Sequence, residues 1–193
     1  APYFINAGNY HSGAQLMELG RYYAACIAEH NIPVETVFGP AYKGIPLAAA
    51  AAVALADKYQ KDVNFCFDRK EVKDHGEGGM FVGKKLTDGE KVVIIEDVTT
   101  AGTSIEETLP IIKAQGDVDV LGLVVSVDRC ERGKGEKSAL TEIQEKYGFR
   151  TTAIVTMKEV VEHLYNKEYK GKVIIDDTLK AAIDAYYEQY GVK

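Results

Sequence analysis

Residues 92–104 constrain the fold more than any other part of this chain. Residues 92–95 read VVII, and such an uninterrupted aliphatic run is typical of a parallel strand buried on both faces. Two acids, Glu96 and Asp97, close the strand, small and hydroxyl-bearing residues follow, and a helical pattern begins at Ile105. A buried strand that passes through a short turn into a helix predicts an α/β protein with a parallel sheet.

The turn between this strand and this helix has the chemistry of a sugar-phosphate site. The first N–H groups of a helix have no partners within the helix, and the helix dipole favours an anion there. Gly102 lets the backbone approach a phosphate closely, and the neighbouring hydroxyls can donate hydrogen bonds to it. Because carboxylates repel a phosphate, Glu96 and Asp97 suit ribose hydroxyls, directly or through hydrated Mg2+. The alternative is a purely structural strand followed by a well-capped helix.

The two acids and the run TTAGTS make the binding hypothesis the stronger one. This segment resembles the signature with which type I phosphoribosyltransferases bind 5-phosphoribosyl-1-diphosphate (PRPP). The first acid of that signature is usually Asp, and Glu96 is one methylene longer. The resemblance implies that the PRPP-binding residues of this segment are Glu96, Asp97, Val98, Thr99, Thr100, Ala101, Gly102, Thr103 and Ser104.

Strand and helix patterns alternate through the rest of the chain. We expect strands near residues 3–5, 34–38, 63–67, 120–127 and 151–157, and helices near residues 13–30, 45–59, 105–115, 137–147, 158–166 and 177–190. We see no linker or internal repeat. We therefore predict one phosphoribosyltransferase domain over residues 1–193, with a mostly parallel central sheet and helices on both faces.

A second strand-to-helix turn matches the same family. Residues 38–44 read FGPAYKG, so two glycines flank a tyrosine and a lysine. Many such turns contain Gly and Lys, and this signal is weak by itself. The resemblance implies that Tyr42 and Lys43 bind the pyrophosphate group of PRPP.

Residues 69–83 are charged and glycine-rich with almost nothing to bury, and we predict a flexible loop there. Arg69, Lys70, Lys73 and His75 lie within seven positions of one another. Cations on a closing lid would stabilise a diphosphate leaving group and exclude water, whereas the alternative is a solvated charged loop. The stretch resembles the catalytic loop of orotate phosphoribosyltransferases. This implies that the four residues are catalytic and bind PRPP, and that the loop acts in the neighbouring site of a homodimer.

The resemblance also implies a site for orotate. Arg129 matches the residue that holds the orotate carboxylate, a task that suits a guanidinium fork, although by itself it could be an exposed loop arginine. Phe4, Ile5 and Thr100 match the other base-binding positions. The family joins orotate to PRPP, giving orotidine 5′-monophosphate and pyrophosphate, with Mg2+ held mainly by PRPP and water. Family chains also have an N-terminal helix and a PRPP-contacting lysine, and we expect that this segment is missing here.

Composition narrows the alternatives. The net charge of −6 argues against a nucleic-acid-binding surface. The three cysteines have neither disulfide nor metal spacing, which indicates a reducing, cytoplasmic compartment. No signal peptide is visible, and the longest apolar run is shorter than the ~20 residues that span a bilayer. Two rivals remain: a purine phosphoribosyltransferase, and a PRPP-sensing regulator that binds nucleic acid. The loop sequence, Arg129 and the charge favour the orotate enzyme.

Overall fold

A six-stranded sheet forms the centre of the computed structural model, which describes residue 2 and residues 6–73, 79–99 and 102–192. The strand order is β3-β2-β1-β4-β5-β6, and every neighbouring pair is parallel except β2 with β3. The strands are β1 (Thr36–Gly39), β2 (Asn64–Lys73), β3 (Gly79–Gly83), β4 (Lys91–Glu96), β5 (Asp119–Asp128) and β6 (Arg150–Thr156).

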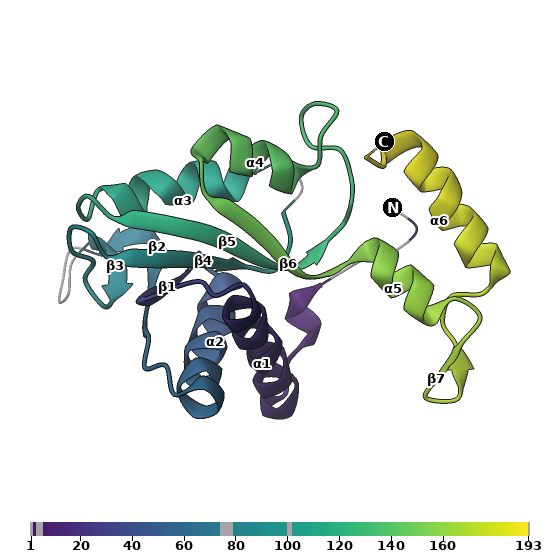
Figure 1. Ribbon diagram of the computed structural model, residues 1–193, viewed down its shortest axis with the longest axis horizontal. Helices are drawn as coiled ribbons and strands as arrows, with labels where there is room; N and C mark the ends of the chain where they lie inside the picture. The colour runs from purple at the N-terminus through teal and green to yellow at the C-terminus, as the bar shows by residue number, and fades with distance from the viewer. Residues whose placement is uncertain (1, 3–5, 74–78, 100–101, 193) are drawn as a thin grey trace.

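Helices cover both faces of this sheet, which confirms the predicted fold class (Figure 1). Helices α1 and α2 pack together on one face, and α3 and α4 lie on the other. The bounds of the helices are Ala7–Asn9 for the short 3-10 helix η1, Gly13–Glu29 for α1, Gly44–Tyr59 for α2, Thr103–Lys113 for α3, Ala139–Tyr147 for α4, Met157–Leu164 for α5 and Asp177–Tyr190 for α6.

Strand β4 shows why its sequence is aliphatic without alternation. Val93 and Ile95 pack into the cluster formed with α1 and α2, whereas Val92 and Ile94 pack into the cluster formed with α3 and α4. Successive side chains of a strand point to opposite faces. Because both faces are covered, all four side chains are fully buried.

Local signals in the sequence begin several helices where expected. The Ser12 hydroxyl accepts a hydrogen bond from the Gln15 backbone N–H, and the Gln15 side chain accepts one from the Ser12 N–H. This reciprocal capping box satisfies two N–H groups that the first turn of α1 cannot pair. Asp176 caps α6 in a similar way by accepting from the Leu179 N–H.

The structure corrects the prediction of a loop over residues 69–83. Residues 69–73 continue β2, and residues 79–83 form β3, which pairs antiparallel with it from Cys66↔Gly83 to Lys73↔Gly79. Phe81 of β3 gives this hairpin an apolar anchor, because its ring centroid lies 5.8 Å from that of Phe38. This contact and the hydrogen bonds of an added edge strand stabilise a charged hairpin. Residues 74–78 lie outside the described residues.

The last part of the chain forms an arm beside the sheet (Figure 1). It contains α5 and α6, both of which were predicted. It also contains a two-stranded hairpin of β7 (Glu168–Tyr169) and β8 (Lys172–Val173), which was not predicted. The buried residues of the arm form their own cluster, made of Met157, Val161, Ile175 and Ile183. Among the described residues, every helix is too short or too polar to cross a membrane.

Close packing of α1 on α2 gives a test of the fold. A Cβ added at Gly20 would lie 2.6 Å from the backbone oxygen of Ala50, whereas one added at Gly13 in the same helix would meet nothing within 4 Å. We expect Gly20→Ala to lower the free energy of unfolding by about 1–3 kcal/mol, because the two helices must separate. Gly13→Ala is the matched control and should leave stability unchanged or slightly higher. Urea unfolding of both variants measures the difference, and equal stabilities would contradict this packing.

Candidate active site

The predicted binding residues gather where the parallel strands end. Strands β1, β4 and β5 are neighbours in the sheet, so their carboxyl ends meet at one edge. The turn from β1 to α2, the acid pair at the end of β4, and the loop after β5 all leave from this edge. In open α/β sheets, ligands bind at this edge of the sheet.

The turn between β1 and α2 is tied to both neighbouring strands. The Ala41 N–H donates to the buried carboxylate of Asp68 in β2 at 2.6 Å. The Lys43 ammonium lies 3.3 Å from Asp97 Oδ2 at the end of β4. Gly39 allows the turn to be this tight, because a Cβ there would lie 2.2 Å from the backbone oxygen of Gly44. Tyr42 is 69% exposed and extends into solvent.

The acid pair is buried, and its two carboxylates have different partners. Asp97 accepts a hydrogen bond from the Val98 N–H at 2.8 Å and faces Lys43. Glu96 accepts a hydrogen bond from the Ser104 hydroxyl. Burial disfavours the charged form of Glu96 and, together with the neighbouring Asp97 carboxylate, raises the pKa of Glu96 to about 7.

Two hydroxyls, one buried and one half-buried, hold the backbone carbonyls of the same pair, and neither was predicted from the sequence. The Tyr23 hydroxyl in α1 donates to the Glu96 carbonyl at 2.5 Å. The Ser126 hydroxyl in β5 donates to the Asp97 carbonyl at 2.5 Å, and the Ser126 N–H donates to the same oxygen at 2.8 Å. The signal for Tyr23 was a hydroxyl on the apolar face of a helix, where a buried polar atom needs a partner.

The turn into α3 has the shape of an anion site. Gly102 precedes the helix with φ of +72° and contributes no side-chain cap, so the first N–H groups of α3 depend on other partners. The Gly102 N–H donates to the Thr99 hydroxyl at 3.3 Å. Thr103 is exposed and Ser104 is half-buried at the start of the helix. Thr100 and Ala101 lie outside the described residues.

Hairpin β2–β3 carries the cations that we assigned to a lid. The Lys70 ammonium is 3.5 Å from Glu107 Oε2 in the first half of α3. This ion pair places Lys70 of β2 beside the start of α3. Arg69 is half-buried in the same strand. Lys73 ends β2 and its backbone pairs with Gly79, whereas His75 lies outside the described residues.

The residues assigned to orotate are only partly described. Phe4 and Ile5 lie outside the described residues, as does Thr100. Arg129 follows the end of β5, and its Nη2 lies 2.8 Å from Glu131 Oε1. Arg129 lies three residues after Ser126, whose hydroxyl donates to the Asp97 carbonyl. Among the described residues, no group of three or more His, Cys, Asp or Glu side chains is arranged to hold a metal ion.

Comparison with known proteins agrees with this geometry. The family model described as "Phosphoribosyl transferase domain" matches residues 6–153. The orotate phosphoribosyltransferase of Lachnoclostridium phytofermentans is 64% identical over 193 residues, which cover 100% of this chain and 86% of that protein. The chain belongs to the orotate phosphoribosyltransferase family. A relative of the same name from Clostridium botulinum is 62% identical over the same lengths.

A solved structure of the same family shares the fold over nearly the whole chain. The crystal structure of orotate phosphoribosyltransferase from Francisella tularensis superposes with a TM-score of 0.82 at 37% identity. The match covers 99% of this chain and 87% of that chain. The family model ends at residue 153, within β6, whereas this structural match also covers the C-terminal arm.

The raised pKa of Glu96 predicts a specific pH dependence of stability. The ordinary carboxyl pKa is 4.5 and the folded value is about 7, so no penalty exists below 4.5, where both states are protonated. Between the two values the unfolded chain loses its proton first, and the folded state is progressively disfavoured, by roughly 3 kcal/mol above pH 7. We expect Glu96→Gln to remove this loss. In urea unfolding, the free energy of unfolding of the wild type should approach or exceed that of the variant at pH 5, and should be lower than that of the variant at pH 8.

A surface variant controls for general effects of charge on that measurement. Glu162 is exposed on α5, and Glu162→Gln should change stability by the same small amount at both pH values. If Glu96→Gln behaves like Glu162→Gln, the carboxyl of Glu96 is not disfavoured by burial.

Proposed function

We propose that this chain transfers the 5-phosphoribosyl group of PRPP to orotate, giving orotidine 5′-monophosphate and pyrophosphate in pyrimidine biosynthesis. The observation that carries the proposal is the buried acid pair, with Lys43 on one side and the start of α3 on the other. This arrangement matches the three parts of PRPP, which are a diphosphate, a ribose and a 5′-phosphate. The names of the close relatives support orotate as the base.

Each part of PRPP has a candidate partner. The first N–H groups of α3 and the Thr103 hydroxyl suit the 5′-phosphate, and the Ser104 hydroxyl would turn from Glu96 to donate to it. Glu96 and Asp97 suit the ribose hydroxyls, since carboxylates accept hydrogen bonds. Lys43, whose ammonium reaches Asp97 from the β1–α2 turn, suits the diphosphate together with Tyr42.

Mg2+ suits this site as a cofactor. Mg2+ commonly keeps several waters and binds substrate phosphates, and the two adjacent buried carboxylates can accept hydrogen bonds from such waters. We propose that Mg2+ is held mainly by PRPP and water rather than by protein side chains. When bound, it would neutralise charge on the diphosphate.

The reaction requires positioning and charge stabilisation rather than a protein nucleophile. The ring nitrogen of orotate loses its proton and forms the new bond to the anomeric carbon of the ribose as the bond to pyrophosphate breaks. The electron pair of the broken bond leaves with pyrophosphate, which can accept the released proton. The cations that the sequence assigns to the lid, namely Arg69, Lys70, Lys73 and His75, would stabilise the departing charge and exclude water from the reacting carbon. The guanidinium of Arg129 would bind the orotate carboxylate, with Phe4, Ile5 and Thr100 beside the base.

We also propose a homodimer in which the hairpin of one subunit completes the neighbouring site. A cytoplasmic location is supported by three free cysteines in the described chain. We further propose that residues 1–193 act as one functional domain, since the arm beyond residue 153 hydrogen-bonds to the loop that carries Arg129.

The decisive assay follows orotate absorbance in the presence of PRPP and Mg2+. We expect a PRPP-dependent loss of orotate that orotidine 5′-monophosphate and pyrophosphate reverse. Consumption of hypoxanthine in place of orotate would instead indicate a purine enzyme. PRPP binding without turnover, accompanied by salt-dependent binding of RNA or DNA, would indicate a regulator and contradict the proposal.

Lys73 provides a test of the hairpin's role. We expect Lys73→Ala to lower kcat by about 100-fold while changing the dissociation constant of PRPP by much less, because a contact to charge that develops in the transition state acts on turnover. Lys85 is exposed just beyond β3, and Lys85→Ala is the matched control with expected wild-type kinetics. Equal losses of turnover and PRPP affinity would show that Lys73 only binds the ground state.

A further inference from the structure

The C-terminal arm is connected to the loop after β5 through the end of α6. The arm buries its own apolar cluster, including Val161, Ile175 and Ile183, and the loop supplies none of the residues of that cluster. Figure 1 shows that α6 nevertheless runs back toward the sheet and ends near this loop. The contact between the end of α6 and the loop therefore needs an explanation other than formation of the apolar cluster.

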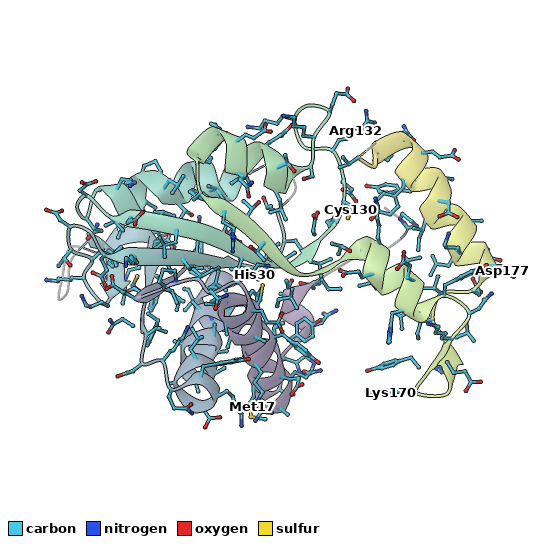
Figure 2. All side chains as sticks on the ribbon, viewed as in Figure 1. Met17, His30, Cys130, Arg132, Lys170 and Asp177 are labelled. Carbon is cyan, nitrogen blue, oxygen red and sulfur yellow. The ribbon has the colours of Figure 1, made fainter. Side chains whose placement is uncertain are left out.

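Hydrogen bonds join the end of α6 to residues 129–132, which we call the Arg129 loop. The Tyr187 hydroxyl donates to the Arg129 carbonyl at 2.5 Å. The Arg132 N–H donates to the Tyr190 carbonyl at 2.9 Å, and the Val192 N–H donates to the Cys130 carbonyl at 3.1 Å. The Arg132 guanidinium also donates to the Gln189 carbonyl. Figure 2 shows Cys130 and Arg132 on the stretch of loop that faces the end of α6.

The Arg129 loop has a conformation that needs such support. Cys130 has φ of +54°, in the left-handed region that residues with a side chain rarely adopt. The Cys130 N–H donates to Asp128 Oδ1 at 2.8 Å, which fixes the residue before Arg129. Glu131 holds Arg129 Nη2 at 2.8 Å and also contacts Tyr186 of α6. Both the backbone and the guanidinium of Arg129 are thus oriented by contacts that involve α6.

We propose that the end of α6 is a positioning element for recognition of the orotate carboxylate, with Tyr187 as its principal positioning residue. The inference rests on the proposed role of Arg129. A guanidinium binds a carboxylate through two parallel N–H donors, which requires a defined plane and distance. Tyr187 fixes the Arg129 backbone from 58 residues away in sequence. Specificity for a base with a carboxylate would then depend on a segment outside the matched domain of residues 6–153.

The test uses the complete chain and two nucleotides that differ by one carboxylate. Orotidine 5′-monophosphate carries the group and uridine 5′-monophosphate lacks it. Removing one hydrogen bond with Tyr187→Phe should weaken binding of orotidine 5′-monophosphate and raise the KM for orotate by about five-fold. Calorimetry should show unchanged affinities for uridine 5′-monophosphate and for PRPP. Tyr169, exposed in β7, gives the matched control Tyr169→Phe, for which both nucleotides should bind as to wild type.

A second variant separates positioning from simple stability. A chain that ends at Gly191 loses the bond from Val192 to Cys130 but keeps the buried cluster of the arm. It should show the same selective loss for orotidine 5′-monophosphate. An equal loss for both nucleotides in Tyr187→Phe and in the shortened chain would mean that the arm only stabilises the protein. No loss for either nucleotide would exclude a positioning role.

Arg129→Ala distinguishes failure of this inference from failure of the proposed function. If Arg129→Ala abolishes the preference for orotidine 5′-monophosphate while Tyr187→Phe keeps it, Arg129 binds the carboxylate and α6 does not position it. If Arg129→Ala also keeps the preference, the proposed role of Arg129 is wrong and the inference fails with it.

Discussion

Two carboxylates buried at the end of a covered strand are the constraint on which the rest of this structure depends. Burying a charge is costly unless partners compensate for it. Asp97 has Lys43 and the Val98 N–H, whereas Glu96 has the Ser104 hydroxyl and a pKa raised to about 7 by burial. The folded protein therefore keeps an electrostatically unfavourable carboxyl group at the carboxyl edge of the sheet. Groups with strongly shifted pKa values are concentrated at sites where ligands bind.

The same constraint explains how the surrounding elements are arranged. Three neighbouring parallel strands deliver their turns to one edge, and the sheet supplies an apolar wall on both faces of β4. Tyr23 from one face and Ser126 from the adjacent strand hold the two backbone carbonyls of the acid pair. The two residues are thus fixed through their backbone carbonyls, while their carboxylates face Lys43, the Val98 N–H and the Ser104 hydroxyl.

Two further elements, the β2–β3 hairpin and the C-terminal arm, flank this edge. Hairpin β2–β3 extends the sheet by antiparallel pairing, and the C-terminal arm has its own apolar cluster. The hairpin is anchored to the core through Phe81, which packs on Phe38, whereas the buried residues of the arm form a separate cluster. The hairpin brings cations toward α3, as the Lys70–Glu107 pair shows, and the arm contacts the Arg129 loop.

The sequence by itself determined the parallel sheet, its helices and the chemistry of the central turn, because these follow from local patterns in residues 12–15, 38–44 and 92–104. The prediction of a loop for residues 69–73 and 79–83 was wrong, because these segments become strands only by pairing with each other, and their sequences lack a clear strand pattern. Only the tertiary structure decided that Asp68 holds the β1–α2 turn, that Tyr23 holds Glu96, and that Tyr187 holds Arg129. These contacts join positions 27, 73 and 58 residues apart, and hydrogen bonds across such separations leave no periodicity or motif in one sequence.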